Sequence, residues 1–103
     1  MSLGAEIQVE RGPDQGKEFT FHKQVTTIGR PGTRKNDIEM NDDTVSKEQT
    51  SIYYDSASKV FTITNESMTN PTKVNGTMIT DPVHLKDGDK IEMGRTVLVF
   101  KKQ

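Results

Sequence analysis

Three polar segments of the sequence carry side chains whose chemistry suits an oxyanion. Arg30 follows a strand-like run, and its guanidinium can bind an oxyanion through two parallel hydrogen bonds. Ser46 and Lys47 place a hydroxyl donor beside an ammonium group, and both groups suit a phosphate oxygen. Thr69 and Asn70 place a hydroxyl beside a carboxamide, which offers the donor and the acceptor that clasping a peptide backbone requires. Together these five residues indicate a local anion site next to a bound peptide.

The elements around these residues are expected to be β-strands. Short runs with apolar residues at every second position alternate with turn signals about every eight to twelve residues, which is typical of a sandwich or barrel. No stretch of the chain has the apolar spacing of an amphipathic helix, so helix should be nearly absent. Strands are expected at residues 7–9, 19–21, 25–28, 51–54, 60–63, 91–93 and 97–100.

Turn-forming residues separate these strands. Polar segments 12–16 and 55–58 are expected to close two hairpins, and Gly94-Arg95 should turn the chain between the last two strands. Asn75-Gly76 and Asp87-Gly88 accept a positive φ at low cost, so they favour tight two-residue hairpin turns.

Three longer polar connections remain, and long loops on a rigid sandwich are where binding groups tend to lie. All five candidate residues fall within them. The three loops cover residues 30–37, 41–49 and 65–73.

Six short motifs, in their order along the chain, resemble those of a known family. They are Gly29-Arg30, Asn36-Asp37-Ile38, Val45-Ser46, Thr69-Asn70, Val74-Asn75-Gly76 and Leu85-Lys86-Asp87-Gly88-Asp89-Lys90-Ile91, with Gly94 following. This ordered set resembles a forkhead-associated (FHA) domain, a β-sandwich that binds phosphothreonine, from about Gly16 to Phe100. The resemblance implies two twisted, mostly antiparallel sheets with about eleven strands, binding loops at one apex, and no catalytic activity.

The resemblance also implies roles for the loop residues. Arg30 and Ser46 match the residues that contact phosphate, and Lys47 holds a position that often adds a further phosphate contact. Thr69 matches the threonine near the phosphate and the phosphothreonine methyl group. Asn70 matches the asparagine that bonds the main chain of the bound peptide.

Structural support and flanking contacts are expected from neighbouring residues. Gly29 lets the chain turn before the first loop, Gln49 buttresses the second loop, and Asn75 and Gly76 match a turn that holds the third loop in place. By their charge alone, Arg34 and Lys35 are candidates to attract acidic residues that flank the phosphothreonine.

Three residues depart from the family pattern. Gln49 stands where the family usually has histidine, Met68 replaces a hydroxyl, and Pro71 follows Asn70 and pushes it toward extended conformations. They leave open an alternative function: a degenerate FHA domain that serves as an interaction or scaffold module independent of phosphorylation.

Composition limits the other functions. The chain of 103 residues has a net charge of −1, so bulk electrostatics will not hold it to nucleic acid or anionic lipid. It has no cysteine, which excludes disulfides and thiolate zinc sites, and no apolar run of membrane-spanning length. The expected partner is a phosphothreonine-containing protein or peptide, with no nucleic acid, no membrane insertion and no cofactor.

One domain is expected, because about 100 residues suit a single core. Residues 1–3, Met1-Ser2-Leu3, look like a cloning remnant, and residues 4–103 are expected to form one FHA domain taken from a longer signalling protein. We expect it to be cytoplasmic and, in isolation, monomeric.

No metal site or active site is expected. The oxygen-rich residues lack the spacing of a twelve-residue calcium loop and are expected to form a solvated acidic loop. His22 and His84 have no third ligand and suit surface positions. Ser46 lacks the surroundings of a catalytic nucleophile, so the chain is not expected to be an enzyme. The oxygen-rich residues are Asp37, Glu39, Asn41, Asp42 and Asp43.

Overall fold

Eleven β-strands and no helix make up the computed structural model, which describes all residues from Met1 to Gln103. The all-β expectation is therefore confirmed. No helix is present that could cross a membrane. The strands are β1 (Ala5–Arg11), β2 (Glu18–Thr20), β3 (Val25–Gly29), β4 (Ile38–Glu39), β5 (Thr50–Asp55), β6 (Val60–Asn65), β7 (Lys73–Val74), β8 (Thr77–Met78), β9 (Val83–His84), β10 (Lys90–Met93) and β11 (Thr96–Lys102).

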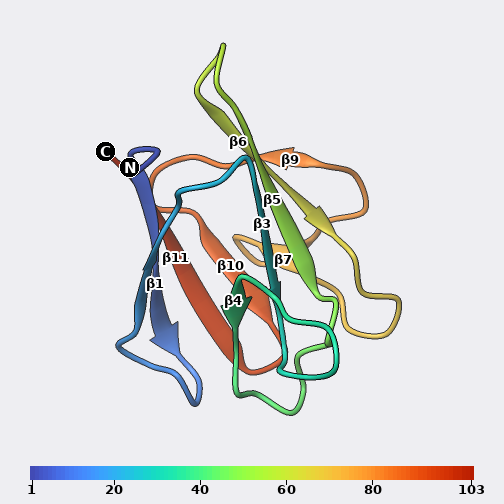
Figure 1. Cartoon of the computed structure of the whole chain (residues 1–103). Helices are drawn as coiled ribbons and strands as arrows, with labels where there is room; N and C mark the ends of the chain where they lie inside the picture. The colour runs from blue at the N-terminus through green and yellow to red at the C-terminus, as the bar shows by residue number, and fades with distance from the viewer.

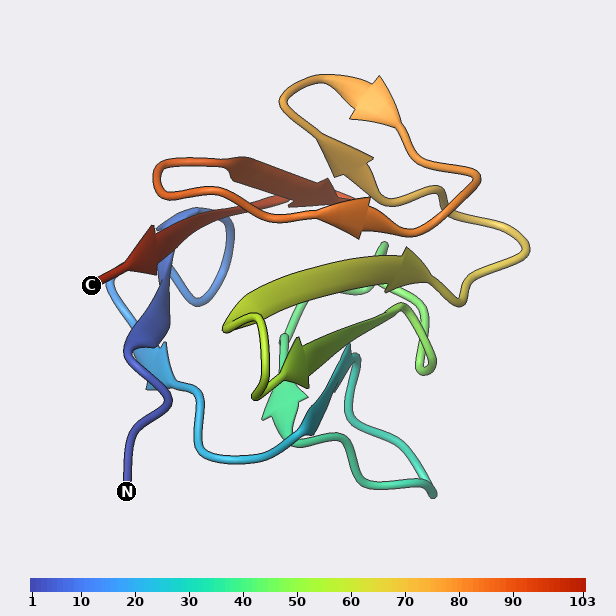
Figure 2. The same cartoon turned by 90° about the horizontal axis from the view of Figure 1, so that it is seen from above.

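The strands form two sheets that pack as a sandwich. One sheet has six strands in the order β2-β1-β11-β10-β7-β8, and the other has five in the order β4-β3-β5-β6-β9. Figure 2 shows them as two layers, with orange and red β10 and β11 in one and green β5 and β6 in the other. All paired strands are antiparallel except β3 and β4, which are parallel. The expected mostly antiparallel sandwich is confirmed.

The core lies between the sheets, because alternate residues of each strand point inward. On the paired strands β1 and β11, Ile7 lies opposite Phe100, and both side chains are fully buried. Phe21 and Phe61 complete an aromatic cluster with Phe100, with ring centroids 5.2 to 5.9 Å apart. Leu3 also packs against the core, although β1 starts only at Ala5. This packed interior gives the loops a rigid base.

Most of the expected hairpins are present. Residues 12–17 join β1 to β2, residues 56–59 join β5 to β6, and Gly94-Arg95 joins β10 to β11. Asn75 and Gly76 have φ of 51° and 83° and form the tight turn between β7 and β8.

The hairpin expected at Asp87-Gly88 is wrong. Gly88 does turn, with φ of 87°, but the flanking strands β9 and β10 belong to different sheets. The turn is closed locally, since Asp89 N–H donates to the Lys86 carbonyl at 3.0 Å and Asp89 accepts the Lys86 N–H. A glycine signal fixes the turn, but it does not determine which sheet the next strand joins.

The loops after β3, β4 and β6 gather at the end of the sandwich away from the two termini (Figure 1). Asp42 stabilises this end of the sandwich. It is completely buried and so departs from the expected solvated acidic loop, whereas its neighbours Asn41 and Asp43 are exposed as expected. Its carboxylate accepts hydrogen bonds from Thr44 and, across the loop end, from the Arg95 N–H at 3.0 Å and the Thr96 hydroxyl at 2.8 Å. Burial raises the pKa of Asp42, but the bonds from Thr44, Thr96 and Arg95 outweigh it and hold the pKa below its ordinary value.

Candidate functional site

Arg30 is a cation anchored to the second loop. Its backbone N–H donates to the Ser46 carbonyl at 3.0 Å, and its Nε donates to the Val45 carbonyl at 2.9 Å. The side chain is half-buried, and no hydrogen bond or ion pair within the protein involves its two terminal nitrogens. The guanidinium is therefore held in place through Nε, while its two terminal nitrogens are free to donate hydrogen bonds.

Ser46 lies in the second loop and contacts the third. It is half-buried, its N–H donates to Gln49 Oε1 at 2.9 Å, and its hydroxyl is 2.7 Å from the hydroxyl of Ser67. The structure thus brings Arg30 and Ser46 together from separate loops.

Lys47 is exposed and helps to pack the first loop onto the second. Its carbonyl accepts a hydrogen bond from Asn36 Nδ2 at 2.7 Å, and its side-chain carbons lie close to Gly32. A Cβ on Gly29 would clash with the same carbonyl oxygen. The close approach of two backbones explains why glycine precedes Arg30.

Gln49 connects the second loop to the third. The side chain is fully buried; Oε1 accepts the N–H of Ser46 and a hydrogen of Asn70 Nδ2, while Nε2 donates to the Asn70 carbonyl at 2.7 Å and to Thr72 Oγ1 at 3.1 Å. Both ends of the amide are therefore used. The resemblance implied that Gln49 buttresses the second loop, and its side chain bonds the backbone of that loop at Ser46 and of the third loop at Asn70.

The side-chain amide of Asn70 points toward the second loop. Its Nδ2 donates to the Thr44 carbonyl at 2.6 Å and to Gln49 Oε1 at 3.0 Å, which uses both of its hydrogens. Only Oδ1 is free of a protein partner. Asn70 in this conformation can therefore accept a hydrogen bond from a peptide N–H, but it cannot also donate one. Thr69 beside it is exposed, and its hydroxyl has no protein partner.

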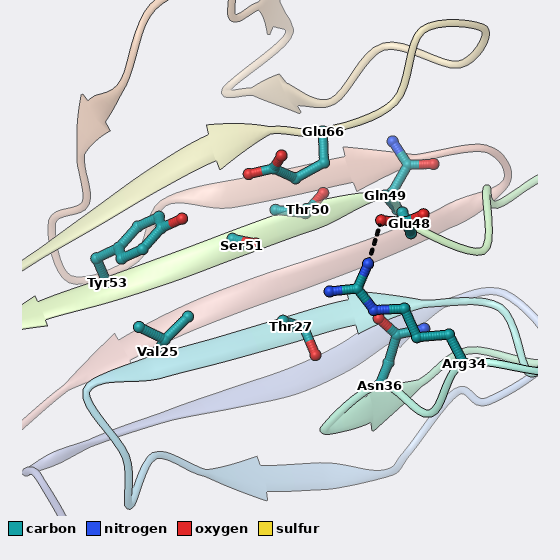
Figure 3. A pocket seen from close by; sticks show the side chains of 10 residues that line it. All are labelled: Val25, Thr27, Arg34, Asn36, Glu48, Gln49, Thr50, Ser51, Tyr53 and Glu66. Carbon is teal, nitrogen blue, oxygen red and sulfur yellow. Dashed lines mark hydrogen bonds and ion pairs between the residues drawn. The ribbon is translucent and has the colours of Figure 1, made fainter.

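Of the two predicted flanking residues, Arg34 lines a polar groove on the outer face of β3 and β5, with Val25 and Tyr53 at the far end of this groove (Figure 3). Arg34 reaches across the groove to Glu48 at 2.6 Å, and both side chains are mostly exposed. Lys35 is exposed and forms no ion pair. The charge of Arg34 is therefore already balanced, whereas that of Lys35 is not.

Asn75 and Gly76 lie apart from this cluster. Asn75 Nδ2 donates to Asp89 at 2.9 Å, and its Oδ1 accepts the N–H of Lys90 at 2.9 Å. The turn fastens β7 to the start of β10, so it supports the third loop only through the strand that follows that loop.

Sequence reasoning missed three polar residues under the site. Ser67 bonds Ser46 and the third-loop backbone, while Thr72 is completely buried and bonds Thr50, Asn65 and Gln49. Asn65 Nδ2 in turn donates to the Ser67 carbonyl at 2.8 Å. Their place in the third loop was the only available signal, because hydroxyl and amide residues are common in any loop.

Known proteins resemble this chain in sequence and fold. The family model of the FHA domain matches residues 26–94. The chain is 31% identical, over 80 residues, to the protein angiogenic factor with G patch and FHA domains 1 of Mus musculus. The aligned segment covers 72% of this chain and 11% of that protein. The chain therefore spans about a tenth of the length of that relative.

Two solved structures share the fold. The FHA domain of a hypothetical protein of Arabidopsis thaliana superposes with a TM-score of 0.85 at 24% identity, covering 95% of this chain and 84% of that one. A second FHA domain, solved in a structural and functional analysis of phosphothreonine-dependent FHA domain interactions, gives a TM-score of 0.83 at 22% identity, with 96% of each chain covered.

Proposed function

Because the chain belongs to the FHA domain family of phosphopeptide-binding modules, we propose that it binds a phosphothreonine-containing segment of a partner protein. FHA domains are protein-interaction modules and are generally not enzymes. The domain solved in the study of phosphothreonine-dependent interactions has the same fold. The proposed binding surface is the loop end formed by residues 30–37, 41–49 and 65–73.

The observation that carries the proposal is the state of Arg30. Its Nε is bound to the Val45 carbonyl, so the guanidinium plane is fixed before any ligand arrives. The two terminal nitrogens remain free, and no carboxylate lies within ion-pair distance. A fixed guanidinium with free donors suits two phosphate oxygens at once.

The other proposed phosphate contacts come from the second loop. The Ser46 hydroxyl and the Lys47 ammonium would supply further donors, because the carbonyl of Ser46 bonds the backbone N–H of Arg30 and Lys47 follows Ser46. Thr69 would add a hydroxyl that has no protein partner from the third loop. Hydrogen bonds to charged groups contribute roughly 1.5 to 3 kcal/mol each. Three or four of them, reduced by ordering costs, correspond to an affinity in the micromolar range, about −8 kcal/mol.

The peptide backbone is proposed to bind at Asn70 through Oδ1. This acceptor would take one main-chain N–H of the ligand, while Nδ2 stays bonded to Thr44 and Gln49. Lys35 is the better of the two proposed flanking contacts for an acidic residue, because Arg34 already pairs with Glu48.

One observation favours the alternative, a scaffold module independent of phosphorylation. Both hydrogens of Asn70 Nδ2 are used within the protein, which halves the hydrogen-bonding capacity of the residue toward a peptide. The alternative leaves the free donors of Arg30 without a role. For that reason we favour the phosphothreonine proposal.

The two functions separate in a peptide-library experiment. A degenerate library with a fixed phosphothreonine should bind the domain, the same library with threonine should not, and Arg30→Ala should abolish the difference. Arg11→Ala is the matched control, since Arg11 is an exposed arginine on β1. Equal binding of both libraries would support the scaffold function instead.

A further inference from the structure

Ser67 holds three hydrogen-bonding partners with a single hydroxyl. Its Oγ is 2.7 Å from Ser46 Oγ, and it accepts the backbone N–H of Asn70 at 2.9 Å and that of Thr69 at 3.3 Å. The residue is only 9% exposed. Its hydroxyl is therefore the point at which the second loop meets the backbone of the third.

The two backbone donors determine where the hydroxyl proton points. A serine oxygen has two lone pairs and one proton. The N–H groups of Thr69 and Asn70 take the two lone pairs of Ser67, so its proton is left for Ser46 Oγ. Ser46 must then accept this hydrogen bond, and its own proton is free to point away from Ser67.

The reverse arrangement is unfavourable. If Ser46 donated to Ser67, the Ser67 oxygen would have to accept three hydrogen bonds, and its own proton would have no partner at a buried position. Leaving a buried polar group without a partner is destabilising, and the cost exceeds the gain from an ordinary hydrogen bond. The geometry thus selects one direction for the bond between the two hydroxyls.

We propose that Ser67 is a positioning residue that makes the Ser46 hydroxyl a donor toward a bound phosphate. The inference rests on the proposed function, because it assigns a ligand to the proton that Ser46 has free. The oxygens of a phosphate dianion only accept hydrogen bonds, so a serine whose proton is not engaged by Ser67 can donate to a phosphate without breaking a hydrogen bond within the protein. A hydroxyl that also accepts a hydrogen bond is a stronger donor, which adds to the effect.

The same hydroxyl fixes the third loop. Because it accepts two successive backbone N–H groups, it sets the path of the chain into Thr69 and Asn70. One side chain thereby links the direction of the phosphate donor to the placement of the peptide contact.

A double-mutant cycle tests the functional part of the proposal. Its probe is one phosphothreonine peptide selected from the library, with affinities measured by titration calorimetry. Ser67→Ala should weaken binding about tenfold, and Ser46→Ala about thirtyfold. The double variant should lose clearly less than the product of the two single losses, because most of the effect of Ser67→Ala on phosphate binding acts through Ser46. A roughly three-hundredfold loss in the double variant, the product of the two single losses, would overturn the proposal.

Two further variants separate positioning from general loop damage. Ser67→Thr keeps the hydroxyl and should restore affinity to within about threefold of the parent. Ser58→Ala is the matched control, because Ser58 is an exposed serine in the β5–β6 turn and bonds only Asp55. If Ser67→Thr bound as weakly as Ser67→Ala, the hydroxyl would not be the active group.

Neutron diffraction from deuterated crystals of the free domain tests the proton direction without any ligand. The deuterium between the two serines should lie on Ser67 Oγ and point toward Ser46 Oγ. A deuterium on Ser46 that points toward Ser67 would refute the inference, even if every variant failed to fold. A correct deuterium position without any phosphothreonine binding would support the hydrogen-bond direction while refuting its role in phosphate recognition and the proposed function.

Discussion

Gln49→Met should uncouple the two loops that form the candidate site. Methionine has nearly the length and flexibility of glutamine, so it can fill the same buried volume while making none of the four amide hydrogen bonds. Two of the four partners keep other bonds: Thr72 Oγ1 retains Thr50 and Asn65, and Asn70 Nδ2 retains the Thr44 carbonyl.

The loss of stability in Gln49→Met comes from the two backbone groups that lose their only hydrogen-bond partner. The Ser46 N–H and the Asn70 carbonyl have no other protein partner. An unsatisfied buried group costs roughly 1 to 3 kcal/mol, and these two are partly buried. We therefore expect the free energy of unfolding to fall by about 2 to 4 kcal/mol and Tm to fall by on the order of 10 °C or more.

Urea unfolding followed by circular dichroism measures this change. Gln24→Met is the matched control, because the Gln24 side chain is exposed and only its carbonyl is bonded. The control should stay within about 0.5 kcal/mol of the parent. If the stability of Gln49→Met also stayed within about 0.5 kcal/mol of the parent, the Gln49 amide would not connect the two loops and the account of the site would be wrong.

Three other perturbations test separate parts of the structure. Gly29→Ala should destabilise the domain by about 2 kcal/mol or more in urea unfolding, because the added Cβ meets the Lys47 carbonyl. Gly32→Ala should cost less, because its Cβ meets only the flexible side-chain carbons of Lys47. Equal losses of stability in the two variants would contradict the close approach of the Gly29 and Lys47 backbones. Phosphothreonine-peptide affinity, measured by calorimetry, should be constant from about pH 7 to 8.5 and fall below about pH 6 as the phosphate gains its second proton. An affinity unchanged down to pH 5 would show that the dianion is not the ligand. Asp42→Asn should destabilise the domain more at pH 7 than at pH 3. The folded pKa of Asp42 is lowered, so the ionised carboxylate stabilises the fold fully above the ordinary value of 3.8, and this stabilisation is lost as pH falls through the folded pKa. Urea unfolding at both pH values measures this difference. Equal destabilisation by Asp42→Asn at both would show that the charge of Asp42 does not stabilise the fold.

The strands could be predicted from the sequence because each buries one face and repeats every two residues. Ile7 and Val9 on β1 follow this rule, but the two-residue strands β4, β7, β8 and β9 are too short to show a period. Their number came only from the family resemblance. The sheet change after Asp87-Gly88 depends on packing between layers, which local turn residues do not encode.

The site residues that could be predicted are those with a motif or a charge. Arg30 and Ser46 belong to short motifs, and the contacts between their loops agree with the expected proximity. Ser67 and Asp42 act through partners 21 and 53 to 54 residues away, so nothing in their local sequence distinguishes them from ordinary loop residues. The contact between the two serine hydroxyls is visible only in three dimensions.

The most direct test of the central claim is an NMR titration of the isotope-labelled domain with a selected phosphothreonine peptide and its unphosphorylated twin. The phosphorylated peptide should shift the backbone amides of Arg30, Ser46, Lys47, Thr69 and Asn70 most strongly, and the unphosphorylated peptide should leave them nearly unchanged. Shifts centred on the groove between Val25 and Tyr53, or equal shifts with both peptides, would contradict a phosphate site at the loop end.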